Sequence, residues 1–331
     1  MTGWVGLGEV GYVGPPELEA TIWRRLMRRP FTGVGTALIT PFKADGSLDE
    51  PAISRLARRQ VAAGVHVLVP CGTTGETPTL SMDERRRVIE LVAVEAQGRA
   101  LVLAGAGGYD TRDVIHMAAM TKAAGADGIL SVTPYYNKPT PEGLYQHYKA
   151  IAESTDLPII VYNVPGRTGC NIDPATLVRL AGIPNIIGVK EASGNISQIA
   201  EICHSVPSDF IVMSGDDAIT LPLMALGGHG IISVASNIVP AEMAQMVEAF
   251  EHGVLSDARH WHNKLLPLMQ VNFVESNPGP VKFAMATMGL CEQTFRLPVV
   301  APRPASQEKI LGVLRDLGLP VVAGSAVGGR A

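Results

Sequence analysis

The sequence predicts an α/β fold, a (β/α)8 barrel of the TIM type with a C-terminal helical appendage. Short apolar runs recur about every thirty residues, and helical patterns separate them. The runs are apolar throughout and do not alternate, as in the strands of a parallel sheet covered by helices. Eight such units in succession favour a closed barrel. The alternative is an open doubly wound sheet, but the first run is not followed by a GxGxxG motif.

The elements follow from apolar runs and from helical spacing. The predicted strands lie at residues 34–39, 65–69, 101–105, 128–132, 158–162, 186–190, 210–214 and 230–234. The predicted helices lie at 48–63, 81–95, 111–124, 142–154, 174–180, 196–203, 218–226 and 241–250. The second of them opens with Ser81 three residues before Glu84, a spacing typical of a capping box. Three further helical patterns, at 255–270, 281–288 and 307–317, exceed what the barrel needs, and we expect them to contact another subunit.

Four segments are expected along the chain. Residues 1–30 are interpreted as a poorly ordered N-terminal extension, 31–252 as the barrel, 253–319 as a C-terminal helical subdomain and 320–331 as a flexible tail. The extension has no continuous apolar core of the kind a signal peptide needs, and Glu17 and Glu19 argue against a transit peptide. Met27 is a candidate for the true start.

Composition excludes several classes of function. With 27 basic and 31 acidic residues the net charge is -4, and no basic stripe or extended Lys/Arg block is present, so nucleic acid and anionic membranes are not expected partners. No apolar run reaches the roughly 18 residues of a membrane span. The four cysteines are scattered without a CxxC pair, and no HExxH occurs, so neither a metal site nor a disulfide framework is indicated. A reducing, cytoplasmic setting fits this pattern.

Lys190 ends the apolar run 186–190 and is the leading candidate for chemistry. Partial burial at the end of a strand disfavours an ammonium group and lowers its pKa. The resulting neutral amine can attack a ketone and form a Schiff base. The alternative is a lysine that extends its charged end into water.

Other polar side chains follow the carboxyl ends of the predicted strands, where barrel active sites lie. They comprise the segment GTTGE at 72–76, TPYYN at 133–137, Tyr162, Arg167 and SGDD at 214–217. Each has a structural explanation by itself: a tight turn, a core tyrosine, a surface arginine, or helix caps at Asp216 and Asp217. Their placement at one rim favours an active site.

In this order, the motifs make the chain resemble the dihydrodipicolinate synthases, within the lysine-dependent aldolases that include N-acetylneuraminate lyase. The matching segments, within about residues 31 to 319, are GTTGE (72–76), VTPYYN (132–137), YNVP (162–165), RTG (167–169), GVKEA (188–192), SGDD (214–217) and NPGPVK (277–282). The resemblance implies a Schiff base between Lys190 and pyruvate, whose enamine attacks L-aspartate 4-semialdehyde on the diaminopimelate route to lysine. It implies no metal and no organic cofactor.

The resemblance also implies roles for single residues. Tyr162, Thr73 and Tyr136 match a proton relay, in which Tyr136 reaches into the site of a neighbouring subunit. A homotetramer, a dimer of dimers, is therefore expected.

Substrate contacts follow in the same way. Thr74 and Ile232 match positions that contact pyruvate, and Gly215 is a further substrate-binding candidate. Arg167 matches an arginine that binds the carboxylate of the semialdehyde.

The chain departs from the family pattern where inhibited bacterial members bind lysine. Met82 and Arg85 stand in place of two histidines, Tyr109 in place of an asparagine, and Asp113 in place of a glutamate. Weak feedback by lysine is therefore expected.

Other functions remain open at this point. They are a pyruvate-dependent aldolase for N-acetylneuraminate or a 2-keto-3-deoxy sugar acid, a phosphate-binding barrel, and a non-catalytic paralogue. The glycine-rich segment 227–230 could suggest a phosphate loop, but it precedes the eighth strand and so lies at the opposite face.

Overall fold

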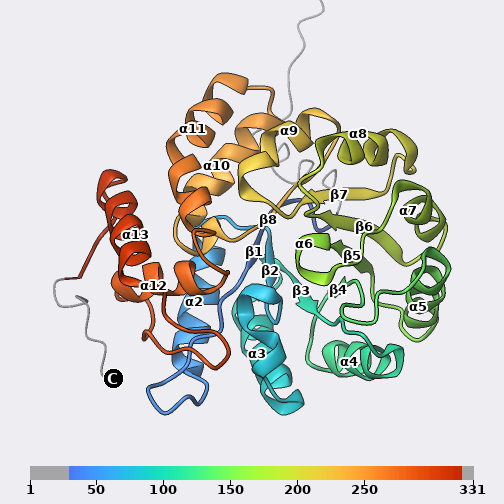
Figure 1. Cartoon of the computed structure of the whole chain (residues 1–331), viewed down its shortest axis with the longest axis horizontal. Coiled ribbons are helices and arrows are strands. Elements are labelled where there is room, and N and C mark those ends of the chain that lie inside the picture. Colours follow the sequence, from blue (N-terminus) through green and yellow to red (C-terminus); the bar gives the residue numbers. More distant parts are fainter. Residues whose placement is uncertain (1–29, 323–331) are drawn as a thin grey trace, which may run out of the picture. The chain divides into compact units, whose positions relative to one another are not determined.

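Eight parallel strands form a closed barrel in the computed structural model, which describes residues 30–322. Each strand pairs with the next along the chain, and β1 pairs with β8. Figure 1 shows the strands at the centre of a ring of helices, which confirms the predicted (β/α)8 barrel. The strands are β1 (Gly33–Ala37), β2 (Val67–Val69), β3 (Leu101–Gly105), β4 (Gly128–Val132), β5 (Ile159–Asn163), β6 (Ile186–Glu191), β7 (Ile211–Ser214) and β8 (Gly230–Ser233).

The surrounding helices agree with the predicted ones to within about two residues, apart from the seventh. They are α2 (Glu50–Ala62), α3 (Met82–Ala96), α4 (Thr111–Ala123), α5 (Pro141–Glu153), α7 (Pro174–Ala181), α8 (Ile196–Ser205), α9 (Thr220–Ala225) and α10 (Pro240–Glu251). The capping box of Ser81 and Glu84 is present at the start of α3. The helix expected at 218–226 divides into the 3-10 turn η3 (Asp217–Ile219) and α9. A short helix, α6 (Pro165–Thr168), was not predicted.

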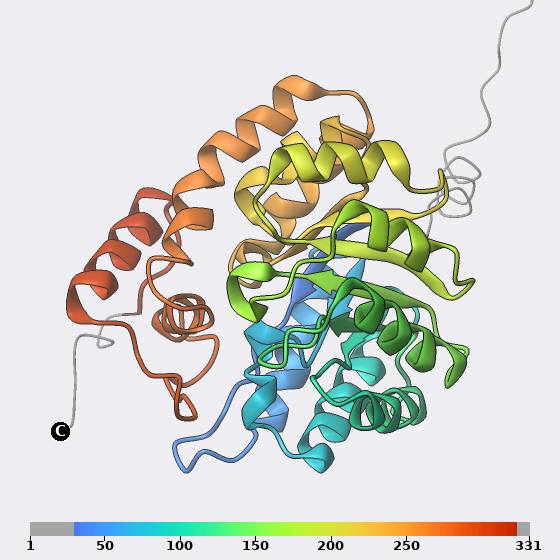
Figure 2. The same cartoon turned by 45° about the vertical axis from the view of Figure 1, so that its right-hand side comes forward.

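Three helices follow the barrel: α11 (Leu255–Val271), α12 (Gly279–Thr287) and α13 (Pro304–Asp316). Figures 1 and 2 both show them together on one side of the barrel. Leu265 of α11, Val281 of α12 and Ile310 of α13 are buried in the same apolar cluster as Val34 of β1. The C-terminal region therefore shares the core of the barrel, and its status as a separate subdomain from residue 253 stays a prediction.

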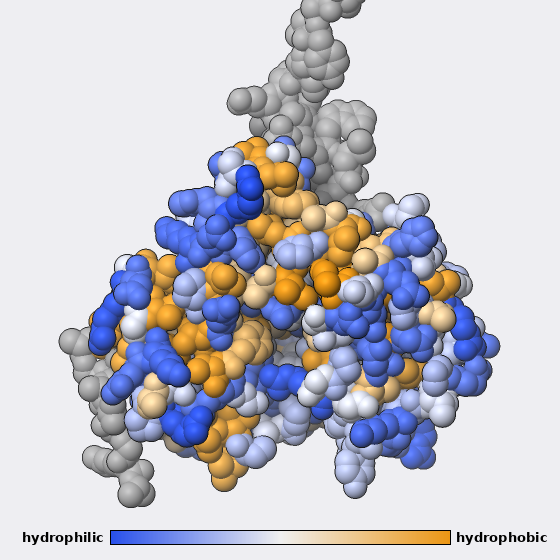
Figure 3. Space-filling view, turned by 45° about the horizontal axis from the view of Figure 1, so that its top comes forward, coloured by the Kyte–Doolittle hydropathy of each residue, from blue (hydrophilic) through white to orange (hydrophobic). Residues whose placement is uncertain are grey.

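The expected N-terminal extension up to residue 29 and the expected tail beyond residue 322 lie outside the described residues. On the face drawn in Figure 3, hydrophilic residues interrupt the hydrophobic ones. Between residues 30 and 322, no helix combines the length and the apolar character that crossing a membrane requires.

Candidate active site

Lys190 and Tyr162 lie side by side at the carboxyl end of the barrel. They are paired in the register of β5 and β6, and only 5% and 7% of their surfaces are exposed. The Nζ atom of Lys190 lies 4.4 Å from the centroid of the Tyr162 ring. Side chains alternate along a strand, so the next residues, Asn163 and Glu191, face outward. There the Asn163 amide donates a hydrogen bond to Glu191 at 2.9 Å, which fixes the register of the inward pair.

The environment of Lys190 raises the fraction of its amine that is neutral. Burial lowers its pKa to about 8 from the ordinary value of 10.5; Asp217 opposes this shift and Arg167 adds to it. Among the described residues, no carboxylate lies within ion-pair distance of the Lys190 amine. Burial also raises the pKa of Tyr162, against the effects of Arg167 and of a hydrogen bond with Thr73, so its phenol stays protonated at neutral pH. The pair thus combines a nucleophile with a proton donor.

The turn after β2 brings two hydroxyl groups to this pair. It consists of the 3-10 turns η1 (Thr73–Gly75) and η2 (Thr77–Thr79). Thr73 lies close enough to Tyr162 to lower the pKa of its phenol, and Thr74 Oγ1 accepts a hydrogen bond from Asn277 Nδ2 at 3.0 Å. The turn passes so close to β3 that a Cβ on Gly105 would lie 1.8 Å from the carbonyl oxygen of Cys71. Only glycine fits at that position.

Two adjoining cavities open at the pair. The smaller, of about 140 Å³, is lined by Lys190, Thr74 and Gly215 among others. The larger, of about 350 Å³, includes residues of the C-terminal region such as Pro298. Both are lined by Thr73, Tyr162 and Arg167. A small keto acid therefore has room beside the lysine, and a second molecule has room next to it.

Arg167 lies on α6, at the wall between the two cavities. Its Nη2 atom donates to the carbonyl oxygen of Asn277 at 3.3 Å, and the side chain makes no ion pair with a carboxylate of the described residues. A guanidinium group with donors left over can bind a substrate carboxylate in a bidentate manner.

Asp216 and Asp217 have different positions. Asp216 caps η3, as expected, and accepts from Ala218 N at 2.9 Å. Asp217 lies inside η3, so its prediction as a cap is wrong. Its buried carboxylate accepts from Ser233 Oγ and from two backbone N–H groups that follow β8, including that of Val234. Burial raises the pKa of Asp217 against these hydrogen bonds. The residue joins the loops after β7 and β8.

Comparison with known proteins decides the family. The profile of the dihydrodipicolinate synthetase family matches residues 30–316. The chain belongs to this family. It is 51% identical over 295 residues to the 4-hydroxy-tetrahydrodipicolinate synthase of Chlorobium phaeobacteroides strain BS1, which covers 89% of this chain and 99% of that protein.

Solved structures of the family agree with the fold. Dihydrodipicolinate synthase from Thermotoga maritima matches with a TM-score of 0.86 at 45% identity, over 88% of this chain and 100% of that one. The chloride-inhibited synthase from Acinetobacter baumannii, solved in complex with pyruvate, matches with a TM-score of 0.86 at 42% identity, over 87% and 99%.

The family resemblance gives roles to Tyr136 and Ile232, but neither residue lines one of the two active-site cavities. Tyr136 is 93% exposed and has a φ of 69°, in the left-handed region, while its neighbour Tyr135 lines the larger cavity. Ile232 is buried in the barrel interior, and Val234, two residues later, lines the smaller cavity. Their roles stay predictions.

Sequence analysis gave no role to Asn277, although it lies in the quoted segment NPGPVK and lines both cavities. Asn277 and Thr74 are 203 residues apart, so local sequence patterns could not predict their contact. The cysteines and histidines supplied no metal motif, and residues 30–322 contain no group of three or more His, Cys, Asp or Glu placed to hold a metal ion.

The four departures from the family pattern lie together. A third cavity, of about 380 Å³, is lined by Met82, Arg85, Tyr109 and Asp113, and also by Tyr135. Arg85 also lines the larger active-site cavity and so lies between the two.

Proposed function

We propose that this protein is a 4-hydroxy-tetrahydrodipicolinate synthase that condenses pyruvate with L-aspartate 4-semialdehyde. The single observation that carries the proposal is Lys190, a buried lysine whose pKa is lowered to about 8 beside a protonated tyrosine. Family membership supports pyruvate as the substrate that this amine attacks.

The reaction begins when the neutral Lys190 amine attacks the keto carbon of pyruvate. Protonation of the resulting hydroxyl releases water and leaves an iminium ion, and loss of a methyl proton gives an enamine. The enamine carbon attacks the aldehyde of the semialdehyde and forms the new carbon–carbon bond. The amino group of the adduct then closes onto the imine carbon and releases Lys190.

Tyr162 is the proton donor for the water that leaves, since its phenol is protonated and lies beside the lysine. Thr73 lies beside Tyr162 and passes protons between it and the second cavity. Thr74 and Gly215 line the pyruvate cavity. General acid–base steps of this kind typically accelerate a reaction by about 10²- to 10⁴-fold.

Arg167 binds the carboxylate of the semialdehyde. It lines both cavities, so a molecule held by it in the larger one can present its aldehyde to an enamine in the smaller one. Neutral aldehydes lack the group that this arginine recognises.

We further propose that the enzyme works in the cytoplasm as a homotetramer, a dimer of dimers. Tyr136 supports an assembly, because an almost fully exposed tyrosine in a left-handed backbone conformation gains little within one chain. A neighbouring subunit that buries it would complete the relay. Sedimentation combined with an activity assay tests this: a fully active monomer would contradict it.

A coupled assay with pyruvate and L-aspartate semialdehyde tests the function itself. Consumption of both substrates at a rate well above that with any other aldehyde is the expected result. Cleavage of N-acetylneuraminate or of a 2-keto-3-deoxy sugar acid with greater efficiency would identify a different aldolase. A lack of turnover with every substrate would identify a non-catalytic paralogue.

A further inference from the structure

A second buried lysine, Lys282 of α12, forms an ion pair with Glu76, the residue that directly follows η1. We propose that this ion pair positions Thr73 and Thr74, so that the C-terminal region controls the geometry of the proton-relay turn. The inference rests on the proposed function, because that function gives Thr73 and Thr74 their roles. Glu76 and Lys282 are positioning residues here: Glu76 lines the larger cavity, but neither residue lines the smaller cavity that contains Lys190.

The ion pair is completely enclosed. The side chains of both residues have 0% exposure, and Lys282 Nζ lies 2.5 Å from Glu76 Oε1. The same Nζ atom lies 4.1 Å from the centroid of the Phe42 ring. Burial lowers the pKa of Lys282, and Glu76 opposes that shift. An enclosed pair of this kind has one geometry, because neither charge can move into water without unpacking the residues around it.

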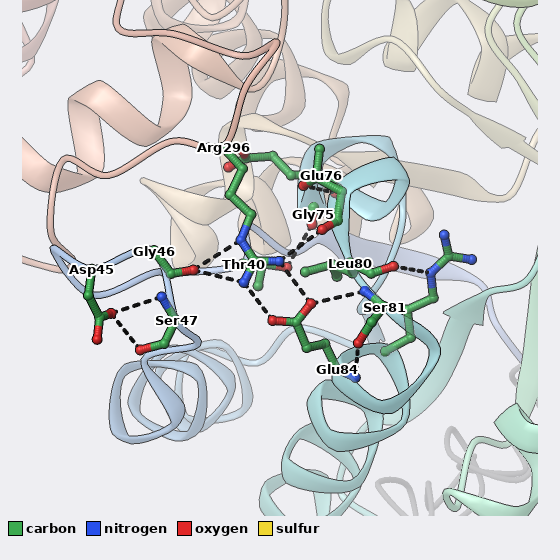
Figure 4. A network of polar contacts seen from close by, with 12 residues as sticks. Thr40, Asp45, Gly46, Ser47, Gly75, Glu76, Leu80, Ser81, Glu84 and Arg296 are labelled. Atoms are coloured by element: carbon green, nitrogen blue, oxygen red, sulfur yellow. Dashed lines mark hydrogen bonds and ion pairs between the residues drawn. The ribbon is translucent and has the colours of Figure 1, made fainter.

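Glu76 depends on its partners for its backbone conformation. Its φ of 53° lies in the left-handed region, which residues other than glycine seldom adopt. Its second carboxylate oxygen, Oε2, accepts from the backbone N–H of Arg296 at 3.1 Å. Figure 4 shows Arg296 beside Glu76, with its guanidinium group bonded to the carbonyl oxygen of Gly46 and to the carboxylate of Glu84 in the first turn of α3. Both carboxylate oxygens are therefore held by the C-terminal region.

The same region holds the middle of the turn. Asn277, five residues before Lys282, donates to Thr74 Oγ1 at 3.0 Å. From the loop after β1, Thr40 Oγ1 donates to the carbonyl oxygen of Gly75 at 2.7 Å. Asn277 and Lys282 belong to one short segment and bind the turn at two points, Thr74 and Glu76. These two contacts leave the turn little freedom to shift. Thr73 is thereby kept within reach of Tyr162.

The experiment is a double-mutant cycle on kcat in the full-length enzyme. Thr73→Ala alone should lower kcat by about 100-fold, as expected for loss of a proton-transfer group. Lys282→Met alone should lower kcat by about 10- to 100-fold, since a shift of 1 Å at a catalytic group can cost about that much. In the Lys282→Met background, Thr73→Ala should lower kcat by less than about tenfold further, because the relay is already displaced.

The KM values for both substrates should change by less than about threefold in Lys282→Met, and borohydride should still trap one pyruvate per chain on Lys190. Losses of kcat that multiply independently in the double variant would overturn the inference. If the wild-type enzyme does not turn over pyruvate and the semialdehyde at all, the proposed function is wrong, and this inference fails with it.

Leu314→Ala is the matched control, because Leu314 of α13 is fully buried in the C-terminal region but, as an apolar side chain, forms no ion pair or hydrogen bond with Glu76 or Lys282. It should lower the melting temperature while leaving kcat of the folded enzyme unchanged. Equal losses of kcat in Leu314→Ala and Lys282→Met would show that general loosening is the cause and would reject a positioning role. If Lys282→Met does not fold, Glu76→Gln replaces it in the same cycle, with the same expected coupling to Thr73.

Discussion

Lys190 and Lys282 are both buried lysines with lowered pKa values, yet their surroundings differ in one respect. Lys282 is bonded to Glu76 at 2.5 Å, whereas among residues 30–322 no carboxylate lies within ion-pair distance of Lys190. Asp217, the acidic residue that acts most strongly on Lys190, keeps its own oxygens bound to Ser233 and to backbone N–H groups. Burial alone therefore does not make a lysine a nucleophile; burial without an ion-pair partner does.

The presence or absence of an ion-pair partner also changes how each lysine affects the free energy of unfolding. Breaking a buried ion pair by removing one partner typically destabilises a protein by about 3–5 kcal/mol. A buried lysine without a partner already destabilises the fold, because the unfolded state can ionise it freely. Replacing Lys282 alone would therefore destabilise the fold, because the buried Glu76 carboxylate would lose its partner, whereas replacing Lys190 breaks no ion pair and removes a buried amine that is retained for its chemistry.

The largest predicted effect concerns which lysine reacts. Lys190→Met should abolish the borohydride-trapped pyruvate adduct and lower kcat by roughly 10⁴-fold or more, since no other neutral amine lies in the cavity. Mass spectrometry of the trapped wild-type protein should place a single adduct on Lys190. An adduct on Lys282 or on Lys138 would break the comparison.

Thermal unfolding supplies the control for that experiment. Lys190→Met should raise the melting temperature and Lys282→Met should lower it, because only the second substitution leaves a buried carboxylate without its partner. Changes of the same sign in both variants would contradict the distinction between the two lysines.

Sequence reasoning predicted the first lysine but not the second. The run 186–190 places Lys190 at a strand end through local apolar patterning, and the same patterning located all eight strands within about two residues. The contact of Lys282 with Glu76 joins residues 206 positions apart, and that of Asn277 with Thr74 joins residues 203 apart. Local periodicity contains no information about such pairings. The short helix that carries Arg167 was also missed, because four residues are too few to show a helical period.

Arg167 is a cation of the site that, unlike the two buried lysines, is exposed to solvent. Arg167→Ala should lower kcat/KM for the semialdehyde by about 30- to 1000-fold, corresponding to about 2–4 kcal/mol for one charge-assisted bidentate contact. The KM for pyruvate should change far less. Steady-state kinetics with each substrate varied in turn measures both effects, and an equal loss for the two substrates would reject this role.

The pKa of Lys190 predicts the pH dependence of adduct formation. The attacking species is the neutral amine, so the rate of imine formation should rise about tenfold per pH unit below about 8 and become constant above it. Rapid-quench trapping with borohydride between pH 6 and 9.5 measures this rate. A rate that still rises tenfold per unit above pH 9 would mean that the lysine has an ordinary pKa and that burial does not activate it.

The smallest expected effect is that of free lysine. In the third cavity Met82 presents no charged or hydrogen-bonding group, and the N–H donors of Arg85 already contact the carbonyl oxygens of Thr77 and Leu80 and the sulfur of Met117. With three of its five N–H donors engaged in this way, Arg85 must give up existing contacts to bind a ligand carboxylate in its best bidentate geometry. Losing two or three contacts of about 1 kcal/mol each weakens binding by about one to two decades. We therefore expect half-inhibition above about 1 mM lysine, which corresponds to about 4 kcal/mol of binding. A dose–response curve with its midpoint below that concentration would show that Arg85 leaves its carbonyl partners to bind the ligand.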